Sequence, residues 1–395
     1  MSEWLKKKVD LSSVINPFYL YCIAFSFSLL LYLMGWSRLF PSLSVGLVLF
    51  LAITFIIFII SGKVFVRKST LSLIFKPLNG NLTDILFCII IALGVVNILY
   101  MGYIPVLDRS HDYRDFGMPV TDPLFNSLSI FFSVLLFRSF LDTRKKRFLV
   151  YFILILILQL IIFRRSSVVW ILASSLILLL LYKKKISLWL IIAVIITLPF
   201  FSYCFGLYGN FRSKLSDTFI MKDLGASNAF MNSGFSYNHY MTYLYVSSPL
   251  ANLQQNVDHR KNGYSGKNFK EFLFYSIIPV SFTLRLEKPL NMFPPECFLI
   301  SPNLIAGSFY MISFYTLGWI GMFIMAFYLI FFILFALFIV RKWKTFGLET
   351  YTLLSVTVSL LIFSNFLNRL DVILMIFVYP ILFDYIYTRY SKVQE

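Results

Sequence analysis

Charged residues, histidine and cysteine are all scarce in this sequence. Only 13% of the 395 residues are Asp, Glu, Lys or Arg, and three are His. A soluble globular domain has about 25% charged residues, so this composition excludes an ordinary soluble protein. Hydrophobic residues make up 59% of the chain, and the mean hydropathy is +0.80. These values predict an all-α, polytopic integral membrane protein.

The few cysteines show no metal-binding spacing. They are Cys22, Cys88, Cys204 and Cys297. Cys204 and Cys297 fall on the same predicted side of the membrane and could pair, but buried free thiols are the favoured interpretation. The sequence also lacks a P-loop, a Rossmann fingerprint, GxSxG and HExxH. These absences exclude nucleotide-driven chemistry, and we expect neither a metal nor an organic cofactor.

The net charge of +17 does not indicate nucleic-acid binding. Most Lys and Arg residues lie in short stretches beside apolar runs, where such charges set the orientation of membrane helices. No cleavable signal peptide is visible, because Met1–Asp10 is polar and basic and no small-residue cleavage site follows the next apolar run. That first apolar run is therefore expected to span the membrane.

Long apolar runs are the main feature that is present. We predict about 10 membrane-spanning helices, within a range of 10–12. The predicted spans cover residues 14–36, 43–61, 84–102, 124–141, 148–163, 167–182, 187–206, 317–340, 350–366 and 372–388.

Basic residues cluster on alternate connections between these spans. The clusters fall at residues 6–8, 63–76, 144–147, 183–185, 341–344 and 389–392. The positive-inside rule assigns them to the cytoplasm, so both termini are expected there. The chain then divides into an N-terminal bundle of about seven spans (1–206), a large outer loop with short helices (207–302), and a C-terminal part (303–395). A short re-entrant or interfacial helix is expected at 301–316, and about three spans follow it.

Several arginines lie on the predicted outer side of the membrane, where the positive-inside rule does not explain them. Arg164 and Arg165 form the whole turn between two apolar runs, and no acid lies near them in the sequence. Arginine binds phosphate bidentately and stays charged, so this pair predicts an anion site, with snorkelling to lipid headgroups as the alternative. Four further outer arginines are weaker candidates: Arg109, Arg114, Arg285 and Arg369. Pairing with Asp112 or Asp115 is an equal alternative for Arg114.

Candidates for proton transfer and sugar binding are few. His239 lies in an aromatic stretch with Tyr237 and Tyr240, and aromatic rings beside polar groups suit sugar rings. A histidine can accept a proton from a sugar hydroxyl, although a histidine satisfied by loop hydrogen bonds is an equal alternative. Among the outer carboxylates, Glu296 is a second candidate base, and no carboxylates form a glycosidase-like pair.

Three stretches of the chain resemble O-antigen polymerases of the Wzy type. Gly102-Tyr-Ile-Pro-Val-Leu-Asp, followed by Tyr113-Arg114-Asp-Phe-Gly117, resembles their first outer loop. Phe163-Arg-Arg-Ser-Ser167 resembles their arginine-bearing turn. Pro302-Asn303, Gly307 and Tyr310, followed by Leu317-Gly-Trp-Ile-Gly321, resemble the stretch that re-enters the membrane after their large outer loop. The layout of many spans and one late, large loop is also similar.

The resemblance implies a membrane fold of the glycosyltransferase-C type in a bacterial inner membrane. It implies transfer of a growing glycan from undecaprenyl diphosphate to an undecaprenyl-diphosphate-linked repeat unit at the periplasmic face, with a chain-length regulator as a further partner. The outer arginines would then neutralise the diphosphate and the charge that develops at the breaking bond. Arg114, His239 and Glu296 become catalytic candidates, and Asn303 becomes a glycan-binding candidate.

Two alternatives remain open at this point. O-antigen ligases share the layout but usually carry a His-Asn pair where this chain has Pro302-Asn303, which weighs against that reaction. A flippase or other transporter of lipid-linked oligosaccharides usually shows repeats and charges near mid-membrane. Here the spans are nearly free of charge, which favours a one-sided enzyme.

Overall fold

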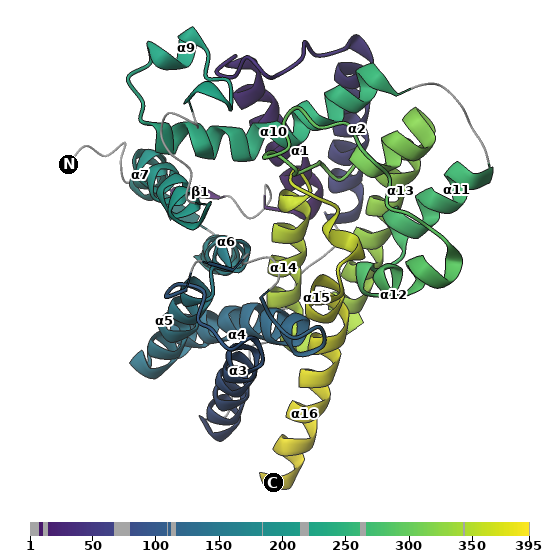
Figure 1. Cartoon of the computed structure of the whole chain (residues 1–395). Helices are drawn as coiled ribbons and strands as arrows, with labels where there is room; N and C mark the ends of the chain where they lie inside the picture. The colour runs from purple at the N-terminus through teal and green to yellow at the C-terminus, as the bar shows by residue number, and fades with distance from the viewer. Residues whose placement is uncertain are drawn as a thin grey trace. The chain divides into compact units, whose positions relative to one another are not determined.

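The computed structural model describes residues 8–10, 15–66, 80–108, 110–111, 116–183, 185–213, 221–260, 266–342 and 344–394. In these residues the chain is mainly helical, and irregular segments such as residues 292–299 connect the helices (Figure 1). Within the described residues there is also one antiparallel pair of three-residue strands, β1 (Lys8–Asp10) and β2 (Lys185–Ser187), in which Val9 lies opposite Ile186.

Within the described residues, five helices are long and apolar enough to cross a membrane. They are α2 (Val45–Ser61) with its continuation η2 (Gly62–Val66), α3 (Gly80–Met101), α4 (Thr121–Thr143), α6 (Arg165–Lys183) and α13 (Met311–Lys342). A sixth apolar helix, α1 (Pro17–Leu33), is shorter. The protein is therefore a helical protein of membrane-compatible composition, and the count of about ten spans stays a prediction.

The chain folds into two compact units that interleave along the sequence. Unit 1 comprises Met1–Lys68, Lys184–Phe332 and Thr357–Arg369, and unit 2 comprises Ser69–Lys183, Ile333–Val356 and Leu370–Glu395. Two helices, α13 and α14 (Gly347–Leu360), contribute residues to both. The predicted division at residues 206 and 302 follows expected membrane topology and stays a prediction.

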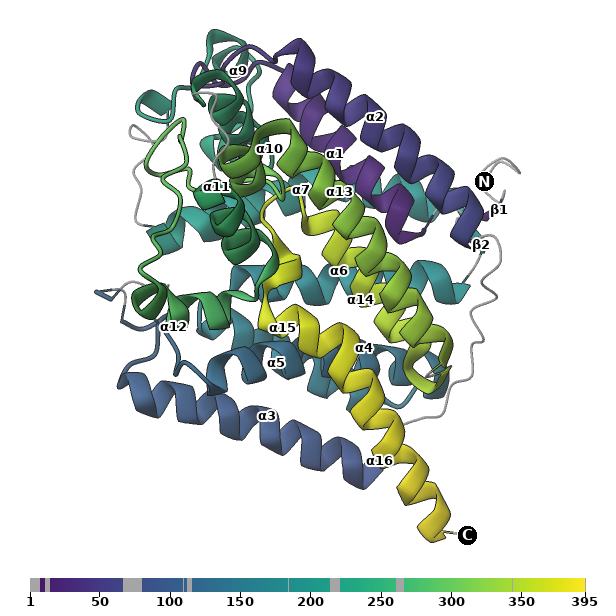
Figure 2. The same ribbon diagram turned by 90° about the vertical axis from the view of Figure 1, so that its right-hand side faces the viewer.

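In unit 1, α1 and α2 lie side by side (Figure 2), and α10 (Tyr237–His259) packs against α1 and α7 (Leu188–Ser213). Apart from its share of α13 and α14, the remaining helices of unit 1 are short: α9 (Asn228–Met231), α11 (Gly266–Phe272), η4 (Leu273–Ile277), α12 (Val280–Leu290) and η6 (Phe366–Asn368). The predicted loop of short helices thus contains one long helix, α10, as well.

Helix α10 is buried although much of its sequence is polar. Asn252 donates from Nδ2 to the carbonyls of Leu304 (2.6 Å) and Ala306 (2.7 Å), and it accepts the Ile300 N–H at 2.9 Å. Asn256 makes the same kind of paired contact with the backbone of Phe298. Buried amides cost little when every polar atom is bonded, so this asparagine ladder holds the irregular segment 298–306 against the helix.

Helix α13 is interrupted at Gly318, whose backbone has φ 59° and ψ −144°. The expected re-entrant segment at 301–316 is irregular up to Tyr310 and then helical from Met311 to the break. The break frees carbonyl groups in the preceding turn. Arg260 donates to the carbonyls of Tyr315 (2.9 Å) and Thr316 (3.1 Å), and Asn268 donates to that of Thr316 (3.2 Å).

In unit 2, α4 packs against α3, α5 (Lys146–Ile161) and α6. The unit also contains η5 (Lys344–Phe346), the first part of α14, α15 (Leu370–Ile373), η7 (Leu374–Val378) and α16 (Tyr379–Gln394). Most of α4 is enclosed by protein, and Gly94 of α3 lets that helix approach Phe125 closely.

Candidate functional site

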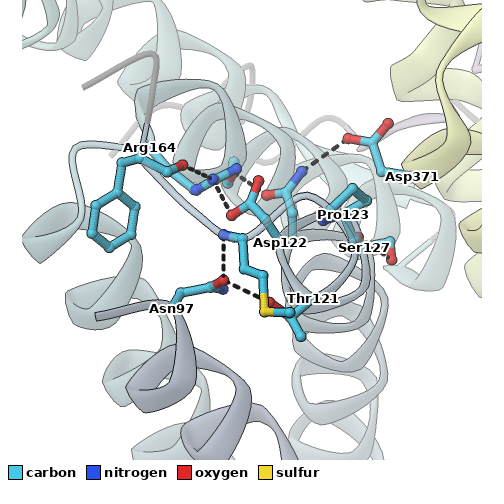
Figure 3. A network of polar contacts seen from close by, with 11 residues as sticks. Asn97, Thr121, Asp122, Pro123, Ser127, Arg164 and Asp371 are labelled. Atoms are coloured by element: carbon cyan, nitrogen blue, oxygen red, sulfur yellow. Dashed lines mark hydrogen bonds and ion pairs between the residues drawn. The ribbon is translucent and has the colours of Figure 1, made fainter. Parts of the chain in front are cut away.

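A cluster of polar side chains lies at the beginning of α4 and of α6, in unit 2 (Figure 3). Asp122 and Asn126 are four residues apart on α4 and therefore share one face. Arg164 and Ser167 come from the turn between α5 and α6 and from the first turn of α6, and Asp371 comes from α15. The cluster is thus built from segments that are far apart in the sequence.

The arginine turn is held by its backbone and by one carboxylate. Phe163 adopts a left-handed conformation (φ 57°), and the Arg164 N–H donates to the Gln159 carbonyl at 2.9 Å. The Arg164 guanidinium forms an ion pair with Asp122 and donates to the Phe116 carbonyl at 3.2 Å. Each side chain of the ion pair is 20% exposed. The interpretation that no acid neutralises this turn was wrong for Arg164, because the fold supplies one from α4.

Gly117 makes room for that carboxylate. Its φ of +118° lies in the left-handed region, and a Cβ atom added there would collide with the side chain of Asp122. Asn97 of α3 fixes the same segment, since its Oδ1 accepts the N–H of Met118 (3.0 Å) and the hydroxyl of Thr121 (2.8 Å). The segment that precedes α4 therefore leaves room for the Asp122 side chain to pair with Arg164.

A second chain of hydrogen bonds begins at Ser167. The Ser167 hydroxyl donates to Oδ1 of Asn126, and Nδ2 of Asn126 donates to Oδ2 of Asp371 at 2.9 Å. Oδ1 of Asp371 accepts the N–H of Val372 at 3.0 Å. All three side chains of the chain are buried. The first turn of α6, which starts at Arg165, is thereby tied to both α4 and α15.

The structure places the other predicted site residues as follows. Arg165 is half-buried at the first position of α6. Arg109 and Arg114 lie outside the described residues. The remaining predicted residues belong to unit 1: His239, Glu296, Arg285, Arg369, Tyr237, Tyr240 and Asn303. Their participation in one site with Arg164 and Arg165 stays a prediction.

His239 lies at the start of α10 among aromatic rings. Its Nδ1 is 2.9 Å from the Ser236 hydroxyl, and its ring centroid is 5.7 Å from that of Tyr203 and 5.2 Å from that of Phe235. Tyr237 is half-buried. Tyr240 is fully buried, and its hydroxyl donates to the Leu224 carbonyl at 2.7 Å, so its ring packs in the core of unit 1.

The remaining unit 1 candidates are more exposed. Glu296, Asn303 and Arg285 are all exposed, and Arg285 lies on α12. The Arg369 guanidinium stacks 5.3 Å from the centre of the Phe366 ring. The four cysteines are free thiols; three are partly exposed and Cys88 is exposed, so the expectation of free thiols is confirmed but that of full burial is not.

Sequence reasoning missed a buried ion pair elsewhere in unit 2. Nη1 of Arg138 lies 2.8 Å and 2.7 Å from the two carboxylate oxygens of Glu349, and both side chains are buried. Asp142, four residues along α4, lies 3.8 Å from Nε of Arg138. The available signal was an arginine inside an apolar run with an acid at the i+4 position. Its partner on α14 is 211 residues away, and no local pattern indicates it.

No protein-family model, curated protein or solved structure matches this chain. The described residues show the class of protein, a helical protein with several apolar helices of membrane-spanning length.

Proposed function

We propose that this protein is a membrane glycan polymerase that uses undecaprenyl-diphosphate-linked oligosaccharides. It would transfer a growing glycan from one lipid diphosphate to the non-reducing end of a repeat unit on another. The proposal includes about ten spans, both termini in the cytoplasm, the 207–302 segment in the periplasm, and a bacterial inner membrane. It is supported by the apolar helices, the charge pattern, the family resemblance and the arginine turn.

The observation that carries the proposal is the anchored turn at Arg164 and Arg165. Asp122 fixes the guanidinium of Arg164, and the Ser167–Asn126–Asp371 chain fixes the first turn of α6. Arg165 therefore begins a rigidly held helix whose N-terminal end carries positive partial charge. A preorganised cation at a helix N-terminus favours a phosphate group, because no reorganisation is needed when negative charge develops there.

The proposed reaction needs an anion site and a base. An acceptor sugar hydroxyl attacks the anomeric carbon of the donor glycan, and the bond to the diphosphate oxygen breaks. Negative charge then grows on the diphosphate, which Arg165 and Arg164 would stabilise, together with Arg109 and Arg114 of the predicted outer loop. The hydroxyl proton passes to a base, for which His239 and Glu296 are the candidates.

A second candidate function is transport of the lipid-linked oligosaccharide across the membrane. The buried pair of Arg138 and Glu349 favours it, because ionisable groups within membrane helices often mark transport pathways. Arg138 is one of the few charged residues within the predicted spans, and Glu349 directly precedes the predicted span 350–366. Nη1 of Arg138 contacts both carboxylate oxygens of Glu349 and both side chains are buried, as in a structural ion pair, so we rank transport second.

The test is the lipopolysaccharide banding pattern of a deletion strain complemented with variants. We expect Arg164→Ala and Arg165→Ala to abolish the ladder and leave cores capped with one repeat unit, while the protein remains in the membrane. Bare cores would indicate a ligase, and repeat units trapped on the cytoplasmic side would indicate a transporter.

Arg147→Ala is the matched control. Arg147 also pairs with an acid, Asp84, at a helix start, but it lies on the predicted cytoplasmic side. Its variant should keep the full ladder. Full ladders from both Arg164→Ala and Arg165→Ala would contradict the proposal.

A further inference from the structure

Helix α12 presents an exposed apolar face. Phe282, Leu286 and Leu290 recur every four residues and so lie on one face; they are 53%, 40% and 55% exposed. Phe293, which follows the left-handed C-cap residue Asn291, is 74% exposed. Of the residues of α12, all of which the structure describes, Thr283 alone is buried.

The basic residues of α12 lie on another side of the helix, beside Leu284, which is 66% exposed. Ser281, Arg285 and Lys288 follow helical spacing on one face, and both basic residues are exposed. The one acid of the helix, Glu287, is half-buried. Burial raises the pKa of Tyr275 to about 12, and nearby Glu287 contributes to the rise, so this carboxylate lies beside the protein. The exposed charges of α12 are therefore both positive.

The start of α12 is fixed beside the connection between two predicted spans. Nδ2 of Asn365 donates to the carbonyl of Ser276 at 2.7 Å, and Nδ2 of Asn368 donates to that of Tyr275 at 3.1 Å. Residues 365–368 lie at the outer end of the predicted span 350–366. By that topology, these contacts hold η4, and α12 directly after it, at the outer surface of the membrane.

Exposed apolar side chains also occur on the two elements that precede α12. Phe269 of α11 and Leu273 of η4 are 50% and 40% exposed. Exposed apolar side chains on three consecutive elements, together with the exposed cations of α12, fit a bilayer interface, where acyl chains meet headgroup phosphates.

We infer that α12 is an interfacial helix whose apolar face enters the outer leaflet while Arg285 and Lys288 bind the phosphates of anionic phospholipids. This inference does not depend on the glycan chemistry. It gives Arg285 a lipid-anchoring role in place of the substrate-binding role that the sequence predicted. An anchored α12 would also hold the segment 298–306, and with it α10, at a set depth relative to the bilayer surface.

The experiment measures the depth of spin labels on the full-length protein in nanodiscs. Labels are attached after Leu286→Cys and, separately, after Ser281→Cys, in a background where the four native cysteines are replaced by serine. We expect the label at position 286 to be reached by oxygen in preference to a water-soluble nickel chelate. The label at position 281, on the basic face, should show the reverse preference.

Lipid composition separates the possible sources of the phosphate. Adding phosphatidylglycerol to phosphatidylcholine nanodiscs should move the label at position 286 deeper, and the double variant Arg285→Ala/Lys288→Ala should abolish this shift. Equal access of the nickel chelate to both labels would overturn the inference. So would shielding of position 286 from both reagents, which would indicate a protein partner, or a shift produced only by added undecaprenyl diphosphate, which would indicate a substrate site.

Discussion

Arg164 shows how far a single residue can be interpreted from the sequence. Its position in a two-residue turn between apolar runs marked it as unusual, and the structure places it in a polar cluster. Its partner Asp122 lies 42 positions earlier, and only the packing of α4 against α6 brings the two together. Gly117 ends the stretch that resembles the family's first outer loop, but the sequence did not indicate that its backbone makes room for that carboxylate.

The buried ion pair of Arg138 and Glu349 leads to a prediction about the stability of single-residue variants. Glu349→Gln or Arg138→Leu removes one partner of a buried ion pair and leaves the other charge uncompensated, which costs about 3–5 kcal/mol. The double variant Arg138→Met/Glu349→Leu should recover most of that loss. The measurement is thermal unfolding of the four proteins in one detergent.

Two outcomes would contradict the structural assignment of this pair. One is a single variant as stable as the unmodified protein. The other is a stable double variant that has lost glycan assembly, which would give the pair a role in transport or catalysis.

At the scale of elements, the broken helix α13 depends on one glycine. Gly318 has φ 59° and ψ −144°, a conformation that residues with a side chain rarely adopt. We expect Gly318→Ala to cost about 1–3 kcal/mol, the typical range for such backbone strain, and to lower the unfolding midpoint. Gly266→Ala is the matched control, because a Cβ there meets nothing within 4 Å and Gly266 is a glycine without positive φ.

A Gly318→Ala variant that unfolds at the same temperature as the Gly266→Ala control would show that the break in α13 does not require glycine at position 318. Arg260→Ala should act in the same direction as Gly318→Ala, because Arg260 donates to two carbonyls before the break.

The apolar runs and charges predicted helices well, but they did not predict how polar helices are buried. Each of the predicted spans falls on a described helix or a succession of helical turns. Helix α10 was predicted as part of a loop with short helices, and its buried residues include the polar Asn252 and Asn256. Their amides are satisfied by the backbone of 298–306, a non-local pairing that periodicity cannot reveal. The catalytic base likewise depends on spatial neighbours and stays a prediction.

For the whole molecule, the orientation in the membrane is the most accessible prediction. In a background without native cysteines, Ser233→Cys should react with a membrane-impermeant thiol reagent in intact spheroplasts, because residues 207–302 are proposed to be periplasmic. Lys145→Cys, between predicted spans on the cytoplasmic side, should react only after permeabilisation. Both positions are exposed in the structure. The reverse pattern would invert the topology and remove the proposed function with it.

The most direct test of the proposed polymerase uses the purified full-length protein in proteoliposomes with an undecaprenyl-diphosphate-linked oligosaccharide from the source strain. Mass spectrometry of the products should show glycans that grow by whole repeat units, with free undecaprenyl diphosphate released at each step. Arg165→Ala should show no growth, and Arg147→Ala should match the unmodified protein. Unextended substrate with the folded, unmodified protein would contradict the account, as would movement of the intact substrate between leaflets without any new glycosidic bond.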